Sequence, residues 1–399
     1  MCKLPSSLWS LVFSRLPFTE NKALGATTRV LHSISLLASS APMAILNVKN
    51  NILPYNLPKL HARELMIRGL DIYTSSCLTA LYGMTSLRGL DISHCNFKDL
   101  NSIYELTFLT KLNVGINMIR DFSPLANLSV LRSLSIDCYE EKSISTLPLL
   151  SNLTSLRINV CSGIKDLCFV KPLTFLRNLS IDRACGMEDI SGIITLVQLT
   201  SLNLSHVSNN LDISPIAELT TLTSVCLKYC EKICDISPLA RLGQLSTLDL
   251  TGCFLIRDFT ALGALTDLIE LTITDCNITD LTPISRLKKL EKLDMNKCLG
   301  VKDLNPLTGL NLYELNISSC NLVTSISPLR RHTNLRILTM NNCRAILEIN
   351  EIYGLTRLTN LDSSQNYDLY RQKNLARNSR SNVYKYIFLI GFISILFFY

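Results

Sequence analysis

One short motif is written fourteen times along this chain. Each copy starts with a leucine, places an aliphatic residue two positions later, and usually reaches a cysteine or asparagine three positions after that. After a first step of 25 residues, every later step is 22 or 23 residues. The lead residues are Leu65, Leu90, Leu112, Leu134, Leu156, Leu179, Leu202, Val225, Leu248, Leu271, Leu293, Leu315, Leu338 and Leu361. So strict a period predicts a solenoid, in which each coil contacts only its neighbours and no single coil stands out as an active site.

The first half of each copy predicts a short strand followed by a turn. Leu248 to Leu250 alternates between apolar and polar, as a half-buried strand does, and Cys253 follows at the turn. An asparagine here would satisfy backbone groups, whereas a cysteine would mainly fill a small space. The turn residues are Cys95, Asn117, Cys161, Cys230, Cys253, Cys276, Cys298, Cys320, Cys343 and Asn366. Leu70, Tyr139, Ala184 and Val207 break the rule, and distorted turns are expected there.

The second half of many copies reads Asp-aliphatic-Ser-Pro-aliphatic, as in Asp235 to Leu239. Asp or Ser suits the start of a short helical turn, and Pro suits its first position. A coil of this length has room for a strand and a short 3-10 turn only. The resulting acidic column could also form a calcium ladder, but capping is the favoured interpretation. The column comprises Asp99, Asp121, Asp166, Asp189, Asp212, Asp235, Asp258, Asp280 and Asp303.

The repeat pattern over about residues 46–369 resembles that of leucine-rich repeat proteins. The copies ending in DISPL are most similar to the internalin and phosphatase-regulatory-subunit type, and the cysteine turns are similar to those of trypanosome leucine-rich repeat proteins. The resemblance implies an α/β horseshoe with a parallel sheet on its concave face and short 3-10 turns on its convex face. Leu46-Asn-Val48 reads as one more, degenerate copy at the start.

In this fold, the residues that alternate with the strand aliphatics face solvent on the concave side, where a protein partner would bind. Arginine and tyrosine dominate such contacts, and the later coils are mildly acidic, which favours a basic partner. The candidate contact residues are Arg157, Arg183, His206, Tyr229, Asp249, Asp275 and Asp294. The sequence has no Gly-rich phosphate loop, no GxSxG and no HExxH motif. We therefore expect a non-enzymatic protein-binding scaffold without a cofactor.

Charge and cysteine content argue against a nucleic-acid-binding protein, a disulfide-bonded protein and a metal-binding protein. The formal charge is +7, but removing the five cations of residues 370–385 leaves +2 on the rest, so the repeats are not expected to bind nucleic acid. Fifteen cysteines, eight of them at repeat turns, favour a reducing compartment over a disulfide framework. Cys226, Cys230 and Cys234 fall at three different places in the repeat, so no metal site is expected.

Residues 1–45 do not follow the repeat and allow two interpretations. Apolar residues at helical spacing predict a helical cap over the first coil. The segment also resembles an F-box, whose opening matches Leu4, Pro5, Leu8, Val12 and Leu16, although the usual closing Trp is missing. That resemblance implies binding to a Skp-type adaptor, which would make the protein a substrate receptor of a ubiquitin ligase.

Residues 370–385 form a basic spacer, and residues 386–399 are almost wholly apolar. Together they predict a short tail anchor with the repeats in the cytosol, where a basic flank belongs. A GPI signal and translation past a lost stop codon are the alternatives. A third class, a surface or membrane-anchored recognition protein, would fit the six glycosylation sequons, yet the repeat grammar generates Asn-Leu-Ser/Thr triplets by itself.

Overall fold

The computed structural model describes residues 43–47 (backbone only), 62–68, 81, 83–139, 144–207, 210–346, 352 and 354–364. They belong to two compact units. The first unit comprises residues 1–186 and 191–199, and the second comprises residues 187–190 and 200–399.

The strands are short and follow one another along the chain. In the first unit they are β1 (Met43–Asn47), β2 (Glu64–Arg68), β3 (Gly89–Asp91), β4 (Lys111–Asn113), β5 (Ser133–Ile136), β6 (Ser155–Ile158) and β7 (Asn178–Ile181). In the second unit they are β8 (Ser201–Asn203), β9 (Ser224–Cys226), β10 (Thr247–Asp249), β11 (Glu270–Thr272), β12 (Lys292–Asp294), β13 (Glu314–Asn316), β14 (Ile337–Thr339) and β15 (Asn360–Asp362).

Within each unit, every strand pairs in parallel with the next strand in the sequence. The lead residues stand opposite one another: Leu90 pairs with Leu112 in the first unit, and Leu248 with Leu271 in the second. This register puts every lead leucine on the same side of the sheet. They are 2% exposed or less from Leu65 to Leu338, so the predicted half-buried strands are confirmed in both units. Leu361, in the last strand, is partly exposed.

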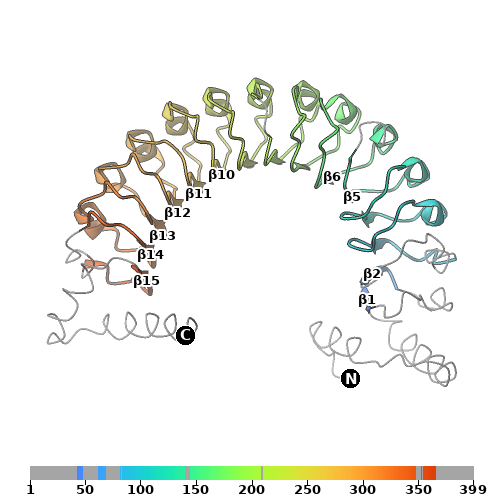
Figure 1. The fold of residues 1–399 in the computed structure, drawn as a ribbon, viewed down its shortest axis with the longest axis horizontal. Helices are drawn as coiled ribbons and strands as arrows, with labels where there is room; N and C mark the ends of the chain where they lie inside the picture. The colour runs from blue at the N-terminus through green and yellow to red at the C-terminus, as the bar shows by residue number, and fades with distance from the viewer. Residues whose placement is uncertain are drawn as a thin grey trace, which may run out of the picture. The chain divides into compact units, whose positions relative to one another are not determined.

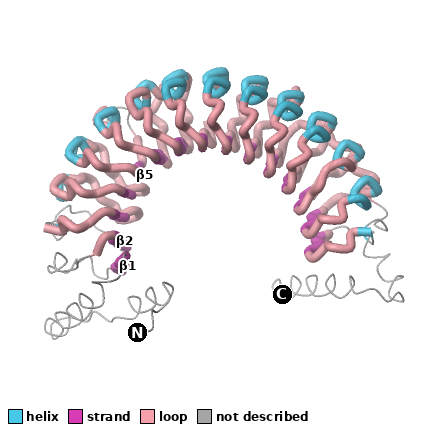
Figure 2. Tube along the Cα trace, turned by 180° about the vertical axis from the view of Figure 1, so that it is seen from behind, coloured by secondary structure: helices cyan, strands magenta, loops and turns pink. Residues whose placement is uncertain are grey.

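Each coil closes through a 3-10 helix or turn on the side opposite its strand, and the described residues contain no α-helix. Within each unit, the strands lie on the inner side of the stack and the helices on the outer side (Figures 1 and 2). The helices are η3 (Asn101–Ile103), η4 (Ser123–Asn127), η6 (Leu147–Leu149), η7 (Cys168–Val170), η8 (Ser191–Thr195), η9 (Ser214–Glu218), η10 (Ser237–Arg241), η11 (Thr260–Ala264), η12 (Thr282–Arg286), η13 (Asn305–Leu307) and η14 (Ser327–Arg331).

The extra coil expected at the start is present, but in a different register. β1 pairs with β2 so that Ala44 stands opposite the lead residue Leu65, and Leu46 stands opposite Ile67. The alignment of Leu46 with the lead position was therefore wrong by two residues. Because side chains alternate along a strand, a shift of two keeps the same face toward the core, and apolar spacing alone does not separate the two registers.

In seven of the eight cysteine turns the thiol donates to a carbonyl of the preceding coil, and in the eighth Cys161 donates to Asp182 of the next coil. In the second unit, the thiol of Cys253 donates to the carbonyl of Leu227 at 3.1 Å, and the thiol of Cys276 donates to that of Leu250 at 3.1 Å. In each case the acceptor lies in the preceding coil. The turn cysteines are buried, as expected of residues that fill a small space, and their thiols also link consecutive coils.

Asn117 shows what the alternative residue does at the same turn. Its amide donates to the carbonyls of Ile92 at 2.9 Å and Val114 at 2.8 Å. Its side-chain oxygen accepts the backbone N–H groups of Cys95 at 3.1 Å and Phe97 at 3.0 Å. Asparagine therefore satisfies the backbone as expected, with more bonds than a thiol can form.

Of the turns expected to be distorted, two are regular. The residue before the turn position has φ 57° at Arg183 and 58° at His206, matching 56° at Tyr229 in a cysteine coil. Ala184 and Val207 therefore keep the same backbone with a smaller or apolar side chain. Distortion is confirmed at Tyr139, which is 45% exposed while Cys138 is buried in its place. Leu70 and Asn366 lie outside the described residues.

The acidic column starts the helical turns, as expected. Asp235 accepts the N–H of Ser237 at 2.8 Å, and seven other members of the column do the same two residues on. The carboxylate sits one residue before the helix N-cap, so it reaches the first helical N–H. Hydrogen bonds from Ser214 and Thr282 lower the pKa of Asp212 and Asp280, so this support is lost only in strong acid.

His332 interrupts a column of leucines that end the helices, represented by Leu242, Leu265 and Leu287. It is 2% exposed, and the ring has only a weak contact with the Leu307 carbonyl, so neither ring nitrogen forms a well-aligned hydrogen bond. Burial lowers its pKa, so below about pH 6.5 the unfolded chain takes up the proton first and stability falls. His332→Leu should raise the free energy of unfolding by about 1–2 kcal/mol at pH 7 and by more at pH 5. Urea titration at both pH values checks this. His94→Asn, at an exposed site, is the control, and equal shifts in both variants would contradict the assignment.

Thiol labelling should divide the described cysteines into two groups. Burial raises the pKa of Cys230, Cys276 and Cys320 to about 12, so these thiols are neutral and shielded in the native state. Cys168, Cys185 and Cys234 are exposed. With iodoacetamide at pH 8, peptide mapping should find the exposed group modified first. The turn cysteines should react only after denaturation, and labelling of both groups at one rate would disprove the assignment.

Candidate protein-binding surface

The strand face of each unit comprises the solvent-facing residues of the strands and the turn residues that follow them. Four of the sequence-predicted contact residues occupy one special position on it. Arg183, His206, Tyr229 and Asp275 all have φ between 56° and 58°, just before the turn. This left-handed backbone costs a non-glycine residue about 1 kcal/mol or more, so the rest of the coil must hold it. The sequence hints at this position through Gly252 and Asn342, the residue types that adopt it most readily.

The coils hold this position through backbone bonds. The N–H of His206 donates to the carbonyl of Lys228 at 2.8 Å, and that of Tyr229 donates to the carbonyl of Thr251 at 2.6 Å. Asp275 donates in the same way to Asn296 at 2.8 Å. Each acceptor belongs to the next coil, so these candidate residues are presented from an ordered backbone.

In the second unit, His206 and Tyr229 form a ring pair. Their ring centroids are 4.8 Å apart with 37° between the planes, and the ammonium of Lys228 lies 5.2 Å from the Tyr229 centroid. Tyr229 also covers Gly252, since a Cβ built there would lie 2.4 Å from its Cδ1. Of the predicted contact residues, these two are brought together, with Lys228 and Gly252 as neighbours that the sequence did not reveal.

Two predicted contact residues have a structural role of their own. One carboxylate oxygen of Asp249 accepts both the N–H of Thr251 at 2.9 Å and its hydroxyl at 2.6 Å. Asp294 accepts the N–H of Asn296 at 3.0 Å. These Asx turns satisfy a backbone donor beyond the strand, which explains the many Asp and Asn residues in this column without any ligand.

The acidic row of the second unit also contains a paired cation. Lys292 donates to Glu270 in the preceding coil, and Glu314 stands beside it in the following coil. The hydrogen bond to Glu270 raises the pKa of Lys292. Asp275 is exposed, and its carboxylate remains the clearest acidic contact on this face.

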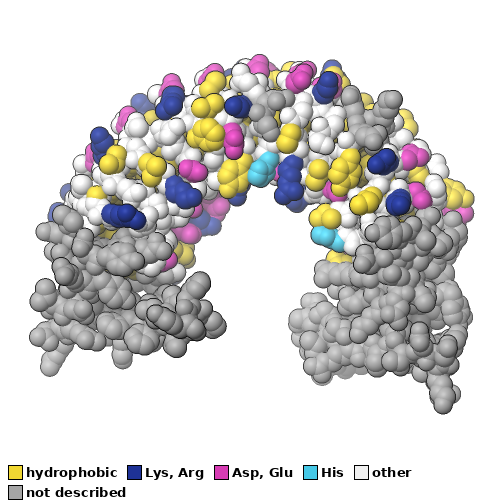
Figure 3. All heavy atoms as spheres, in the orientation of Figure 1, with side chains coloured by type: hydrophobic (Ala, Val, Ile, Leu, Met, Phe, Trp, Pro, Cys, Tyr) yellow, Lys and Arg dark blue, Asp and Glu magenta, His cyan; other side chains and the backbone are white. Residues whose placement is uncertain are grey.

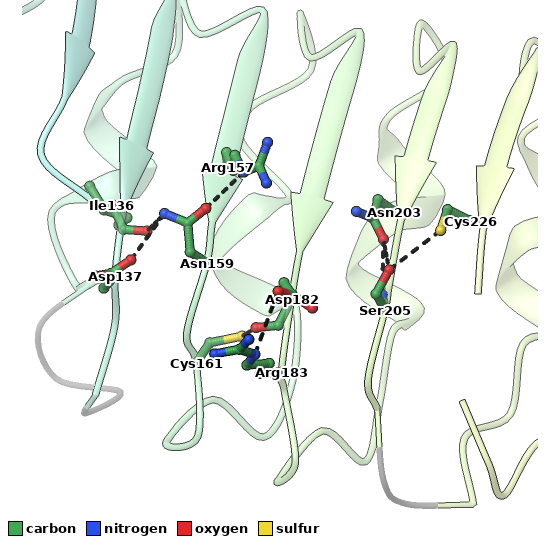
Figure 4. A network of polar contacts seen from close by, with 10 residues as sticks. All are labelled: Ile136, Asp137, Arg157, Asn159, Cys161, Asp182, Arg183, Asn203, Ser205 and Cys226. Atoms are coloured by element: carbon green, nitrogen blue, oxygen red, sulfur yellow. Dashed lines mark hydrogen bonds and ion pairs between the residues drawn. The ribbon is translucent and has the colours of Figure 1, made fainter. Parts of the chain in front are cut away.

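In the first unit, Arg157 is held by a polar network (Figure 4). Its Nε donates to Asn159 at 2.7 Å, and Asn159 in turn donates to Asp137 at 3.0 Å. Asp137 is only 3% exposed and also accepts the N–H of Ile116. Sequence analysis missed Asp137 and Asn159. The same repeat position holds Ser or Thr in some coils and Asp182, Asn296 or Asn341 in others, so it carries no signal that distinguishes these two residues.

Arg183 lies apart from this network. Its Nε is 3.9 Å from Asp182, a long and exposed ion pair of small energetic value. The other carboxylate oxygen of Asp182 is buried without a hydrogen-bond partner. Acidic, basic and apolar side chains are interspersed on the face seen in Figure 3, without one large patch of a single charge.

The remaining predictions concern a metal site, the F-box-like segment and the apolar residues 386–399. No group of three or more His, Cys, Asp or Glu side chains in the described residues could hold a metal ion. Leu4, Pro5, Leu8, Val12 and Leu16, and the apolar residues 386–399, lie outside the described part of the chain. Within the described part, no helix is long and apolar enough to span a membrane.

Comparison with known proteins identifies the fold. An internalin of Listeria monocytogenes, InlF, superposes with a TM-score of 0.65 at 24% identity, over 84% of this chain and 94% of that one. A leucine-rich repeat protein of Leptospira interrogans superposes with a TM-score of 0.58 at 18% identity, over 86% and 97% of the two chains. The chain has the leucine-rich repeat fold with internalin-like coils. No family model and no curated protein matches the sequence.

The ring pair makes Gly252 a sensitive position. It has φ 74°, and a Cβ there would meet the ring of Tyr229. Gly252→Ala should lower the free energy of unfolding by about 2 kcal/mol, through backbone strain and steric overlap. The double variant with Tyr229→Ala should recover the steric part. Gly243→Ala, with nothing within 4 Å of its Cβ, is the matched control. Additive effects of the Gly252 and Tyr229 changes in thermal unfolding would refute the proposed overlap.

Proposed function

We propose that this chain is a non-enzymatic scaffold that binds a protein partner on its strand face. The observation that carries the proposal is the His206–Tyr229 ring pair, held on left-handed backbone by bonds to the next coil. Aromatic residues fixed in one conformation lose little entropy on binding, so they suit the centre of an interface. The internalin-like fold supports a protein-interaction role in general.

The partner would present basic residues to the second unit. Asp275 is exposed, and Glu270 and Glu314 flank Lys292 on the same face. Asp249 and Asp294 each have one oxygen engaged in a turn, so they would contribute mainly through charge. In the first unit, Arg157 and Arg183 are exposed candidates for an acidic part of the partner.

Two finer hypotheses rest on the sequence alone. The F-box-like residues 1–45 would make the scaffold a substrate receptor that binds a Skp-type adaptor. Residues 386–399 would anchor it in a membrane, with the repeats in the cytosol. Recovery of an adaptor and cullin with the tagged full chain would favour the first, and glycosylated sequons would count against both.

Substitutions on the strand face should discriminate binding from folding. Asp275→Lys is structurally mild, because Lys297 occupies the same position with φ 58° in the next coil. We expect Tyr229→Ala and Asp275→Lys each to weaken a partner purified with the tagged full chain by about tenfold or more. Glu218→Lys, exposed in η9 on the side opposite the strands, is the control for charge. Calorimetry or surface plasmon resonance measures the affinity. Partners bound equally by all three variants would overturn the strand-face proposal.

A further inference from the structure

The two units differ in the segment that links each helical turn to the next strand. In the first unit, this segment and the helical turn before it carry seven large apolar side chains that are 41–64% exposed. They are Tyr104, Phe108, Val130, Leu149, Phe175, Ile194 and Val197, here named the apolar flank. In the second unit, the corresponding segments have two, Ile269 and Tyr313, which are 39% and 38% exposed and directly precede β11 and β13. The units differ most at the position four residues before each lead residue, where Phe108, Val130 and Phe175 are matched only by polar side chains in the second unit.

The linking segments of the second unit show which side chains this part of the coil can accommodate. Lys289 pairs with Asp267 of the preceding coil at 2.7 Å, and Arg357 donates to Asn334 at 2.6 Å. These residues align with Phe108, Val130 and Phe175 in the repeat. Polar side chains thus serve the coil equally well, and exposed apolar ones at the same position are unfavourable in water. Extended apolar surfaces of this kind usually mark an interaction site.

Hydrogen bonds join each of these coils to its neighbour near the apolar flank. Asn152 donates to the carbonyl of Ser129 at 2.8 Å, and Thr195 at the end of η8 donates to that of Lys171 at 3.0 Å. Phe108 and Phe175 each occupy the turn before a strand, closed by backbone bonds such as Leu109 N–H to Leu106 at 3.0 Å. Phe108 and Val130 hold the same repeat position in adjacent coils, and Asn152 separates Val130 from Phe175 at that position.

Cations border the apolar flank. The guanidinium of Arg88 lies 4.8 Å from the centroid of the Phe108 ring, and Arg132 and Arg177 follow Val130 and Phe175 by two positions. Arg88, Arg132 and Lys171 form no ion pair with a carboxylate among the described residues. Among the linking segments of the first unit, the one acidic side chain described is Glu105, which accepts the hydroxyl of Tyr104 at 3.0 Å.

We propose that the apolar flank binds the surface of a membrane that contains anionic lipids. Apolar side chains at turn tips would enter the headgroup region, and the bordering arginines and lysine would pair with lipid phosphates. Exposed apolar side chains with cations beside them, such as Phe108 with Arg88, fit such an interface. This surface is separate from the strand face, so the protein-binding proposal stands or falls independently of it.

Vesicle binding by the full chain tests this proposal. The probes are vesicles of phosphatidylcholine with about 30% phosphatidylserine and vesicles of phosphatidylcholine alone. Wild type should sediment with the anionic vesicles and lose binding as NaCl rises from about 0.1 M to about 0.5 M. Phe108→Ser with Phe175→Ser should lower the partition coefficient by about tenfold. The matched pair is Phe254→Ser with Leu299→Ser, exposed at 40% and 57% in the second unit, and it should bind like wild type.

The comparison of the two pairs isolates the flank, because any other membrane-binding part of the chain is shared by both variants. Arg132→Glu with Lys171→Glu is a second test that leaves the apolar residues in place, and it should also weaken binding to anionic vesicles by about tenfold. Wild type that does not bind anionic vesicles would overturn the proposal. So would equal binding by both serine pairs, or a flank pair whose loss appears only in self-association measured by analytical ultracentrifugation.

Discussion

Hydrogen bonding between neighbouring coils, from the turn side chain or from the backbone N–H before it, is the constraint on which the rest depends. A solenoid has no distant contacts to fix its geometry, so each coil must be positioned by its neighbours alone. The carbonyl of Leu250 illustrates this, because it accepts the N–H of Cys253 in its own coil and the thiol of Cys276 in the next. Both lone pairs are thereby used in a place that water does not reach. The left-handed residue before the turn is tolerated because these bonds, and its own N–H bond to the next coil, hold it.

Much of the fold could be predicted from the sequence, because the same pattern recurs in many coils and does not depend on any one of them. The lead leucines, the buried cysteines and the capping aspartates recur often enough that one irregular copy changes nothing. The predictions that were wrong concerned individual coils. The register of β1 was wrong by two residues, and Ala184 was expected to distort its turn although the backbone there is regular. In both places the neighbouring coils impose the geometry, and the local residue only has to fit. His332 escaped notice although the repeat places it in the column of Leu242, Leu265 and Leu287, so its burial could have been predicted from the register.

The candidate surface was harder to predict than the fold, since its residues serve two purposes. Asp249 and Asp294 were selected as acidic contact residues, yet each completes a turn in its own coil. Tyr229 was selected as a lone aromatic residue, yet it packs on His206 and occupies the space that Gly252 leaves open. The alternation of residues identifies which ones face solvent but does not tell which hydrogen bonds they form. The network of Asp137 and Asn159 around Arg157 was missed for the same reason.

Because the coils repeat, a surface residue in one coil can be compared with the residues at the same position in the other coils. This comparison shows which surface residues the fold requires. A polar residue at a column where every coil needs one has a structural explanation, as the capping aspartates do. An apolar residue exposed at a column that other coils fill with ion pairs has none, because Lys289 and Asp267 show that the coil folds without it. The exposed side chains of Phe108, Val130 and Phe175 therefore represent a cost that the fold does not require. Asp249, in contrast, has a structural explanation, because its carboxylate accepts two hydrogen bonds within its own turn.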